Sequence, residues 1–126
     1  MSKTIIFTEK APAPIGPYSQ AIKIGKTLYV SGQIPIIPET GQMINDDISK
    51  ETDQVMRNIW AILHAGGMDF SKVVKCSIFV TDMKDFPIVN ATYEKYFDSD
   101  EPARETVQVA ALPKGAHVEI SCIAVD

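Results

Sequence analysis

Two charged side chains stand among apolar neighbours near the end of the sequence. Arg104 opens the run "RETVQVAA", and Glu119 lies between Val118 and Ile120 in the run "HVEI". A charge is costly to bury unless another group pairs with it, so each of these side chains needs a partner. Arginine is the residue best shaped to hold a carboxylate, because its planar guanidinium donates two parallel hydrogen bonds. Binding of a small anion is therefore the chemistry that this part of the sequence suggests.

Strand periodicity decides which residues share a face with the two charges. If both segments are strands, each has one polar and one apolar face. The polar faces hold Arg104, Thr106 and Gln108 in the first strand and His117, Glu119 and Ser121 in the second. One interpretation leaves both faces in solvent, with Arg104 in a surface ion pair, as in many half-exposed sheets. The other places them at a small polar pocket, together with Tyr18 and the Ser31-Gly32 pair.

The elements that would position these residues form an α+β domain. Proline and glycine make 11–19 and 33–43 shaped loops, and Gly25-Lys26 predicts a type II′ hairpin turn. Apolar residues at helical spacing predict a helix from Ser49, its N-cap, to Ala65, and a second helix after a capping Asp85. The other apolar and β-branched runs predict strands at 4–7, 20–24, 27–32, 73–80, 105–111 and 117–125. This order predicts a mixed sheet with both helices packed on one face.

Length and composition place the chain among ordinary soluble domains. Residues 1–126 fit a single domain, with 45% apolar residues, 22% charged residues and a net charge of -4. The acidic balance and the lack of a basic run argue against nucleic acid as a partner. Two cysteines without a close CxxC pair are typical of a reduced core, and no apolar run is long enough for a signal peptide or a membrane span. These features predict a cytoplasmic protein that does not contact a membrane.

Motifs for metals, nucleotides and nucleophilic catalysis are missing from the sequence. The two histidines, His64 and His117, are far apart, and no spacing of His, Cys or carboxylate residues matches a zinc site. No glycine pattern of a nucleotide-phosphate loop is present, and Gly66-Gly67 fits a helix stop. A triad can be assembled from Ser31, His117 and an aspartate, but no G-x-S-x-G elbow supports it. We therefore expect neither a metal nor an organic cofactor.

Four separated motifs resemble the RidA family, the reactive intermediate deaminases. They are "IGPYSQA" at 15–21, "LYVSGQIP" at 28–35, "VNATYEKYF" at 89–97, and "PAR" at 102–104 followed by "VQVAALPKGAHVEI" at 107–120. The similarity covers nearly the whole chain, in the same order and spacing. Four motifs in register are far more specific than any one of them alone.

The resemblance implies a chorismate-mutase-like α+β fold, assembled as a homotrimer with clefts between protomers. It also implies a hydrolase acting on C=N bonds, a 2-iminobutanoate/2-iminopropanoate deaminase. Members hydrolyse 2-aminoacrylate and related small anionic enamine or imine intermediates released by pyridoxal-phosphate enzymes, and the products are ammonia and a 2-oxo acid such as pyruvate or 2-oxobutanoate. Arg104 matches the family arginine that binds the substrate carboxylate, and Glu119 matches the glutamate that positions or activates water. The matching substrate-binding positions of the cleft are Tyr18, Ser31, Gly32, Asn90 and Thr106.

The two residues after the arginine depart from the family pattern. Glu105 and Thr106 stand where many members have a small residue followed by a cysteine or another small residue. On a regular strand Glu105 points away from the face of Arg104, so it need not neutralise the arginine. Thr106 excludes a thiol at its position but keeps the backbone contacts of that residue.

Two other functions are compatible with the same residues. A trimeric sensor would bind 2-oxo acids or small amino acids without turnover, because Arg104 serves binding and catalysis alike. Glu119 favours catalysis, since carboxylate binding alone does not require it. A ribonuclease or translation inhibitor, suggested for some relatives, is disfavoured by the acidic composition. Away from the site, we expect Trp60 to be a packing residue and Cys122 to be an inert core thiol.

Overall fold

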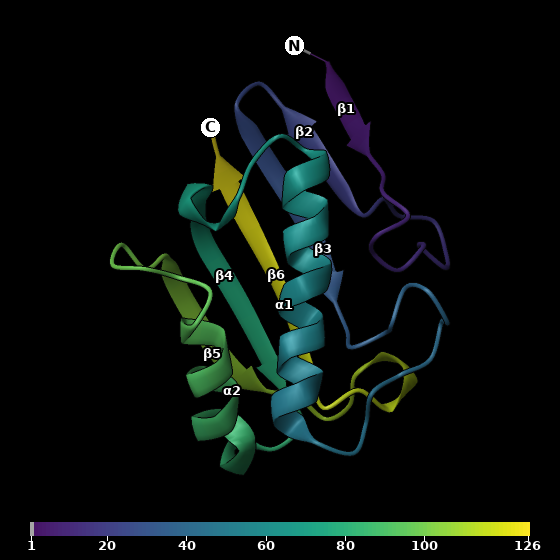
Figure 1. The fold of residues 1–126 in the computed structure, drawn as a ribbon, viewed down its shortest axis with the longest axis vertical. Helices are drawn as coiled ribbons and strands as arrows, with labels where there is room; N and C mark the ends of the chain where they lie inside the picture. The colour runs from purple at the N-terminus through teal and green to yellow at the C-terminus, as the bar shows by residue number, and fades with distance from the viewer. Residues whose placement is uncertain (1) are drawn as a thin grey trace.

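Six strands form one mixed sheet in the computed structural model, which describes residues 2–126 (Figure 1). The strands are β1 (Lys3–Ile6), β2 (Ala21–Ile24), β3 (Thr27–Gln33), β4 (Val73–Val80), β5 (Ala103–Gln108) and β6 (Val118–Val125). Their order across the sheet is β1-β2-β3-β6-β4-β5, and every pair is antiparallel except β4 and β5. The predicted α+β domain with a mixed sheet is therefore confirmed.

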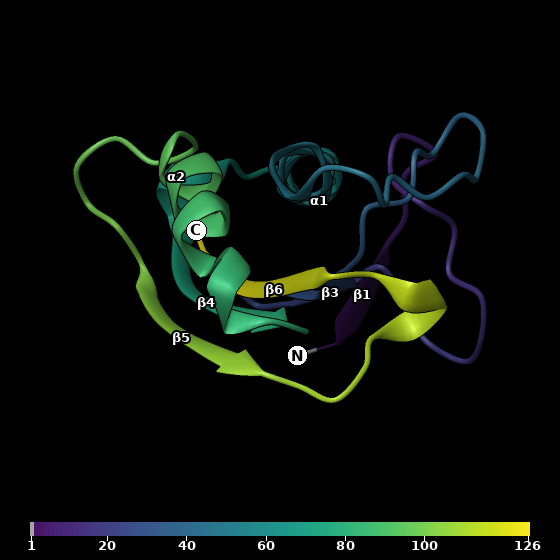
Figure 2. The same ribbon diagram turned by 90° about the horizontal axis from the view of Figure 1, so that it is seen from below.

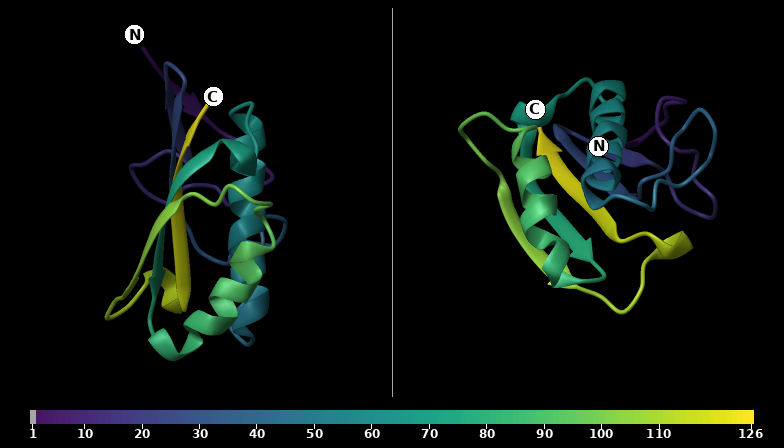
Figure 3. Two further views of the ribbon diagram at one scale, coloured as in Figure 1. Left: turned by 90° about the vertical axis from the view of Figure 1, so that its left-hand side faces the viewer. Right: turned by 60° about the horizontal axis from the view of Figure 1, so that its bottom comes forward.

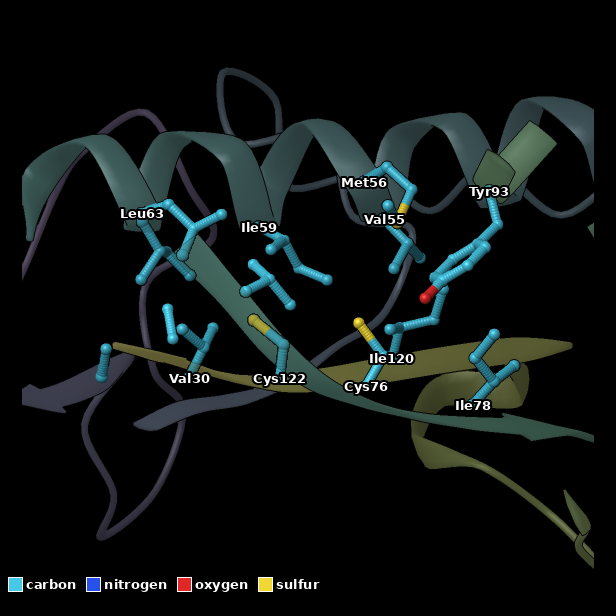
Figure 4. Packing of buried hydrophobic residues seen from close by; sticks show 14 of the residues in the cluster. Val30, Val55, Met56, Ile59, Leu63, Cys76, Ile78, Tyr93, Ile120 and Cys122 are labelled. Carbon is cyan, nitrogen blue, oxygen red and sulfur yellow. The ribbon is translucent and has the colours of Figure 1, made fainter. Parts of the chain in front are cut away.

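Both α-helices, α1 (Ile48–Ala65) and α2 (Phe86–Glu94), cover the same face of the sheet, as predicted (Figures 2 and 3). The apolar stripe of α1 is fully buried and consists of Val55, Met56, Ile59, Ile62 and Leu63. It packs against alternate residues of β4 and β6, among them Ile78 and Ile120 (Figure 4). Each such side chain contributes about 1.5–3 kcal/mol to stability by leaving water. No helix within residues 2–126 covers the opposite face, which we call the open face of the sheet.

Two residues outside the site test the sequence predictions about packing. Cys122 is buried in the core beside α1, and burial raises the pKa of its thiol, so the thiol stays protonated (Figure 4). The prediction for Trp60 is wrong, because this side chain is 45% exposed and stacks on His64 with ring centroids 4.0 Å apart. Trp60 lies on the same side of α1 as the exposed residues Arg57 and His64, three residues before it and four after it.

The starts of both helices differ from the sequence predictions. Asp47, not Ser49, is the N-cap of α1, and its carboxylate accepts hydrogen bonds from the backbone N–H groups of Ser49 and the next residue. Asp47 is the N-cap in place of Ser49 because its carboxylate satisfies two of the free backbone N–H groups at once. Asp85 has helical backbone angles and makes no capping bond, because a 3₁₀ turn already leads into α2. Asp82 caps that turn instead.

The remaining boundaries follow the predictions to within a few residues, and β5 ends at Gln108, earlier than predicted. Gly25 has a φ of +58°, and Lys26 keeps a negative φ, since Lys114 is the only residue other than glycine with a positive φ within 2–126. This combination confirms the type II′ turn between β2 and β3. No helix among residues 2–126 has the length and apolar character that crossing a membrane requires.

Candidate functional site

A β-bulge in β3 forms one wall of the candidate site. Val30 pairs with Cys122 and Gln33 pairs with Ile120, so Ser31 and Gly32 together lie opposite a single residue of β6. Ser31 is held by two bonds to the segment before β2: its Oγ donates to the carbonyl of Ser19 at 2.6 Å, and its N–H donates to the carbonyl of Gln20 at 2.9 Å. Bulges of this kind turn side chains away from the regular strand direction and are common beside active sites.

The Glu119 carboxylate lies directly over Gly32 on the open face. A Cβ atom at position 32 would be 2.7 Å from Oε2 and 2.8 Å from Cδ of Glu119, so only glycine leaves this carboxylate where it is. Glu119 is half-buried, and burial raises the pKa of its carboxyl group. Within residues 2–126 no hydrogen bond to this carboxylate is found. A half-buried, unpaired carboxylate with a raised pKa is suited to act as a general base.

A cavity of about 460 Å³ opens in front of Glu119, and we call it the Glu119 cavity. Four of the predicted site residues line it, namely Tyr18, Ser31, Gly32 and Glu119. Sequence analysis missed its other polar lining residues, Gln20, Gln33 and Lys114. The signal that could have found them is their place inside the family motifs, since all three stand within the quoted runs.

Two buried amides hold the loops that form the rim of this cavity. The side chain of Gln20 accepts from the N–H of Thr8 at 2.8 Å and donates to the carbonyl of Thr8 at 3.0 Å, which fixes the proline-rich loop that carries Tyr18. Asn58 on α1 donates to the carbonyls of Ile34 at 3.2 Å and Ile36 at 3.0 Å, which fixes the loop after β3. Because both amides satisfy backbone groups that have no strand partner, they stiffen the irregular segments around the site.

Arg104 lies on the other face of the sheet, toward α2. Its Cα pairs with that of Cys76, whose side chain is buried under the helices. The guanidinium donates to Oδ1 of Asn90 at 2.6 Å, and its central carbon lies 5.2 Å from the ring centroids of both Phe86 and Tyr93. The side-chain carbonyl of Asn90 and the two aromatic rings hold the guanidinium in place without neutralising its charge. The structure therefore brings the predicted residues Arg104 and Asn90 together.

The prediction that Arg104 and Thr106 share one face of β5, opposite Glu105 and Val107, is confirmed, but this polar face lies toward the helices. Arg104 and Thr106 face the helix side, and the Thr106 hydroxyl is buried there without a hydrogen-bond partner among residues 2–126. Val107, on the open face, is largely exposed. Polar residues are tolerated on this face because β5 is an edge strand only partly covered by α2, so neither of its faces belongs fully to the core.

Glu105 points away from Arg104, as predicted. It lies on the open face, where it accepts a hydrogen bond from the Ser77 hydroxyl and pairs with Lys75 at 3.0 Å. These contacts lower the pKa of Glu105 and occupy its carboxylate. The acidic neighbour therefore leaves Arg104 free to hold an anion.

The predicted site residues form two groups that do not meet within the single chain. Arg104 and Asn90 lie at the edge of the sheet on the helix side, whereas Tyr18, Gly32 and Glu119 surround a cavity on the open face. The hydrogen-bonded sheet separates the two groups. One small ligand in a single chain can therefore touch the arginine or the glutamate, but not both.

Comparisons with known proteins show a family and several solved structures that this chain resembles. A family model described as Endoribonuclease L-PSP matches residues 8–126. A 2-iminobutanoate/2-iminopropanoate deaminase from Bos taurus is 50% identical over 124 residues, which are 98% of this chain and 90% of that protein. Among solved structures, a protein of the conserved Rid family from Yersinia pestis has a TM-score of 0.97 at 50% identity, covering 99% of this chain and 100% of that one. E. coli TdcF, solved with bound serine, has a TM-score of 0.94 at 39% identity and covers 98% of both chains.

Proposed function

Since this chain belongs to the RidA family, whose model is described as Endoribonuclease L-PSP, we propose that it is a 2-iminobutanoate/2-iminopropanoate deaminase. It hydrolyses the imines that form from 2-aminoacrylate and related enamines, and it releases ammonia and a 2-oxo acid. The observation that carries the proposal is the unpaired, half-buried carboxylate of Glu119, which lies against Gly32 and faces an open cavity. Relatives that bear this activity in their names are about half identical to the chain over nearly its whole length.

Hydrolysis follows from the chemistry of one carboxylate and one water molecule. Water adds to the carbon of the N-protonated imine while Glu119 accepts a proton from that water, so a carbinolamine forms. Glu119 then returns the proton to the amine nitrogen, the C–N bond breaks, and ammonia leaves with the bonding electron pair. Loss of the hydroxyl proton to solvent completes the 2-oxo acid. One water is consumed for each ammonia released.

Arg104 binds the carboxylate of the substrate in this proposal. Its guanidinium is already oriented by Asn90 and by the rings of Phe86 and Tyr93, so little side-chain freedom is lost when an anion binds. Two parallel N–H donors also fix the plane of the substrate, which sets the direction from which water attacks. Tyr18, Ser31 and Gly32 line the cavity together with Glu119.

We further propose that the protein is a homotrimer in which each site is shared between two protomers. Arg104 of one protomer then meets Glu119 of its neighbour, which removes the separation that the sheet imposes within one chain. The open face supports this assembly because it carries an apolar row across three strands, with Ile5 65% exposed, Ile22 beside it and Tyr29 50% exposed. Exposed apolar surface of this kind marks a protein interface. A cytoplasmic location is part of the proposal, supported by two free, buried cysteines.

Mixing two inactive variants tests the function and the shared site together. Arg104→Ala removes the carboxylate grip, and Glu119→Gln removes the base but keeps the shape of the side chain. Each variant alone should lose ten- to a hundredfold or more in kcat/KM, on the order expected for one charge-assisted contact or one general base. The assay couples the protein to a pyridoxal-phosphate dehydratase that generates the imine, and it measures 2-oxo acid and ammonia.

Hybrid trimers distinguish a shared site from a site within one chain. When the two variants are unfolded, mixed in equal amounts and refolded, one pairing in four joins an intact Glu119 to an intact Arg104. A shared site therefore predicts recovery of about a quarter of the wild-type activity. No recovery in hybrids that light scattering shows to be trimers would contradict a shared site. Wild-type activity of either single variant would contradict the assigned roles.

A sensor that binds small amino acids or 2-oxo acids without turnover is the second candidate. It is favoured by the serine bound to E. coli TdcF, a relative at 39% identity. Calorimetry with pyruvate and serine on Glu119→Gln, together with the imine-hydrolysis assay on the wild type, separates the two functions. Under the proposed deaminase function this variant binds pyruvate but turns over slowly, whereas a pure sensor shows ligand binding without imine hydrolysis even in the wild type.

A further inference from the structure

A second cavity, of about 440 Å³, lies on the helix side of the molecule and shares no lining residue with the Glu119 cavity. Three segments form it: the outer side of α1, the 3₁₀ turn Phe70–Lys72, and the residues that follow α2. Its lining consists of aromatic and acidic side chains with two serines between them. This cavity also shares no lining residue with the pocket around Arg104, which the proposed trimer places at an interface.

Aromatic rings form the wall of this cavity. Phe70 packs on Tyr96 and on Phe97 with ring centroids 5.3 Å apart in both pairs, which ties the turn before β4 to the segment after α2. Trp60 completes the wall, and its indole is held by the stack on His64. An exposed indole fixed in this way offers a flat, electron-rich surface to a ligand.

Carboxylates line the same cavity. They belong to Asp69, Asp98 and Asp100, and none of the three forms an ion pair within the part of the chain that the structure describes. Asp69 is oriented by hydrogen bonds from the backbone N–H and the hydroxyl of Ser71, and these bonds lower the pKa of its carboxyl group. The cavity is therefore negatively charged, on a chain whose net charge is already -4.

Negative charge beside aromatic rings selects an organic cation. A metal ion needs several ligands that converge on one point, and within residues 2–126 no three His, Cys, Asp or Glu side chains do so. A guanidinium group fits better, because it is planar, stacks on an aromatic ring and donates hydrogen bonds to separate carboxylates. We propose that this cavity binds an arginine side chain of a partner protein.

A partner polypeptide fits this cavity better than a free small cation. The lining residues Trp60, Asp69, Asp98 and Asp100 are exposed, so a single guanidinium would remain partly in solvent. A solvated ion contact and an exposed cation–π contact are each weak. Residues flanking the arginine in a polypeptide add backbone and apolar contacts around the rim, which a free cation does not have.

Trp60 reports on this cavity directly, because it is the only tryptophan of the chain. The probe is the blocked tripeptide Gly-Arg-Gly, and the matched control peptide carries citrulline, which keeps the shape but not the charge. We expect a saturable change in tryptophan emission with the arginine peptide and an affinity at least about tenfold lower with the citrulline peptide. Blocked single arginine should bind more weakly than the tripeptide.

Two double variants that remove the same number of charges show whether the peptide binds at this cavity. D98N/D100N removes two carboxylates of the cavity, and E9Q/E39Q removes two exposed carboxylates elsewhere on the surface. The first should weaken the arginine peptide at least about tenfold and the second should leave it unchanged. Thermal melts check that both variants are folded.

Three results would overturn arginine binding at this cavity. They are no emission change at about 10 mM arginine peptide, an equal response to citrulline, and equal weakening in both charge variants. A blocked single arginine that binds as tightly as the tripeptide would show a small-cation site and would overturn the assignment of a protein partner. Imine hydrolysis by D98N/D100N should equal that of the wild type, so failure here does not coincide with failure of the proposed deaminase function.

Discussion

Replacing Gly32 by alanine tests the Glu119 site without removing any functional group. The new Cβ would lie 2.7 Å from Oε2 of Glu119, whereas ordinary contact begins at 3.4 Å, so the carboxylate must retreat by 3.4 − 2.7 = 0.7 Å. Gly32 does not have a positive φ, so alanine brings no backbone strain at this position. The substitution therefore moves the proposed base and leaves the fold intact.

The size of the effect follows from this displacement. A shift of about 1 Å in a catalytic group can cost about a hundredfold in rate, so a shift of 0.7 Å predicts a kcat about 10- to 100-fold lower. This loss corresponds to about 1.4–2.7 kcal/mol in the activation barrier. KM should change little, because the arginine that binds the substrate carboxylate is not affected. Folding stability should change by less than about 1 kcal/mol, since glycine to alanine at a compatible position costs nothing in backbone strain.

A double-mutant cycle with Glu119→Gln shows whether Gly32 acts through the glutamate. The coupled imine assay gives kcat and KM for both single variants and for the double variant, and thermal melts give their stability. If the alanine acts only by displacing Glu119, it should add almost nothing once the base is gone. A fully active Gly32→Ala variant, or losses that multiply in the double variant, would refute the reasoning.

Three further predictions concern pH, the hydrogen bond between His117 and the buried Glu51, and the open face. Burial raises the pKa of Glu119 above the ordinary 4.5, so kcat/KM should fall as pH decreases through that raised pKa. The same shift stabilises the fold only below the ordinary pKa, and this stabilisation is lost as pH rises through the folded-state pKa. Glu119→Gln removes the half-buried charge, so it should raise Tm at about pH 7 but not at about pH 4. His117→Ala should lower the free energy of unfolding in urea by about 1–3 kcal/mol, because it leaves the buried Glu51 without the ring nitrogen that lies 2.8 Å away, and adding Glu51→Gln should restore part of the loss. Tyr29→Glu should give folded monomers by light scattering and circular dichroism, and an intact trimer would contradict the use of the open face as the interface.

Local sequence determined the elements of the fold. The helical spacing of Val55, Ile59 and Ile62 predicts α1 correctly, and Gly25-Lys26 predicts the type II′ turn. These features depend on residues within one or two turns of the chain, so short-range periodicity and backbone preference are sufficient. The start of α1 is harder to predict, because Asp47 and Ser49 are both good N-caps and the local pattern alone does not choose between them.

The residues of the candidate site are also visible in the sequence, partly through residue type and partly through the family motifs. Arg104 and Glu119 stand out as charges in apolar runs, and the motif at 28–35 adds Ser31 and Gly32. Their types show what chemistry they can perform. Their spacing does not show that the arginine lies on the helix side and the glutamate on the open face.

Only the tertiary structure decided those positions, because they depend on pairing between distant segments. The bulge that brings Gly32 under Glu119 exists only in the register between β3 and β6, and the surroundings of Arg104 depend on β5 becoming an edge strand beside α2. Residues that meet across a sheet carry no mark of their partner in the local pattern, since alternation defines two faces but not what covers each of them. The same holds for Trp60, whose place outside the core was set by how α1 rolls onto the sheet.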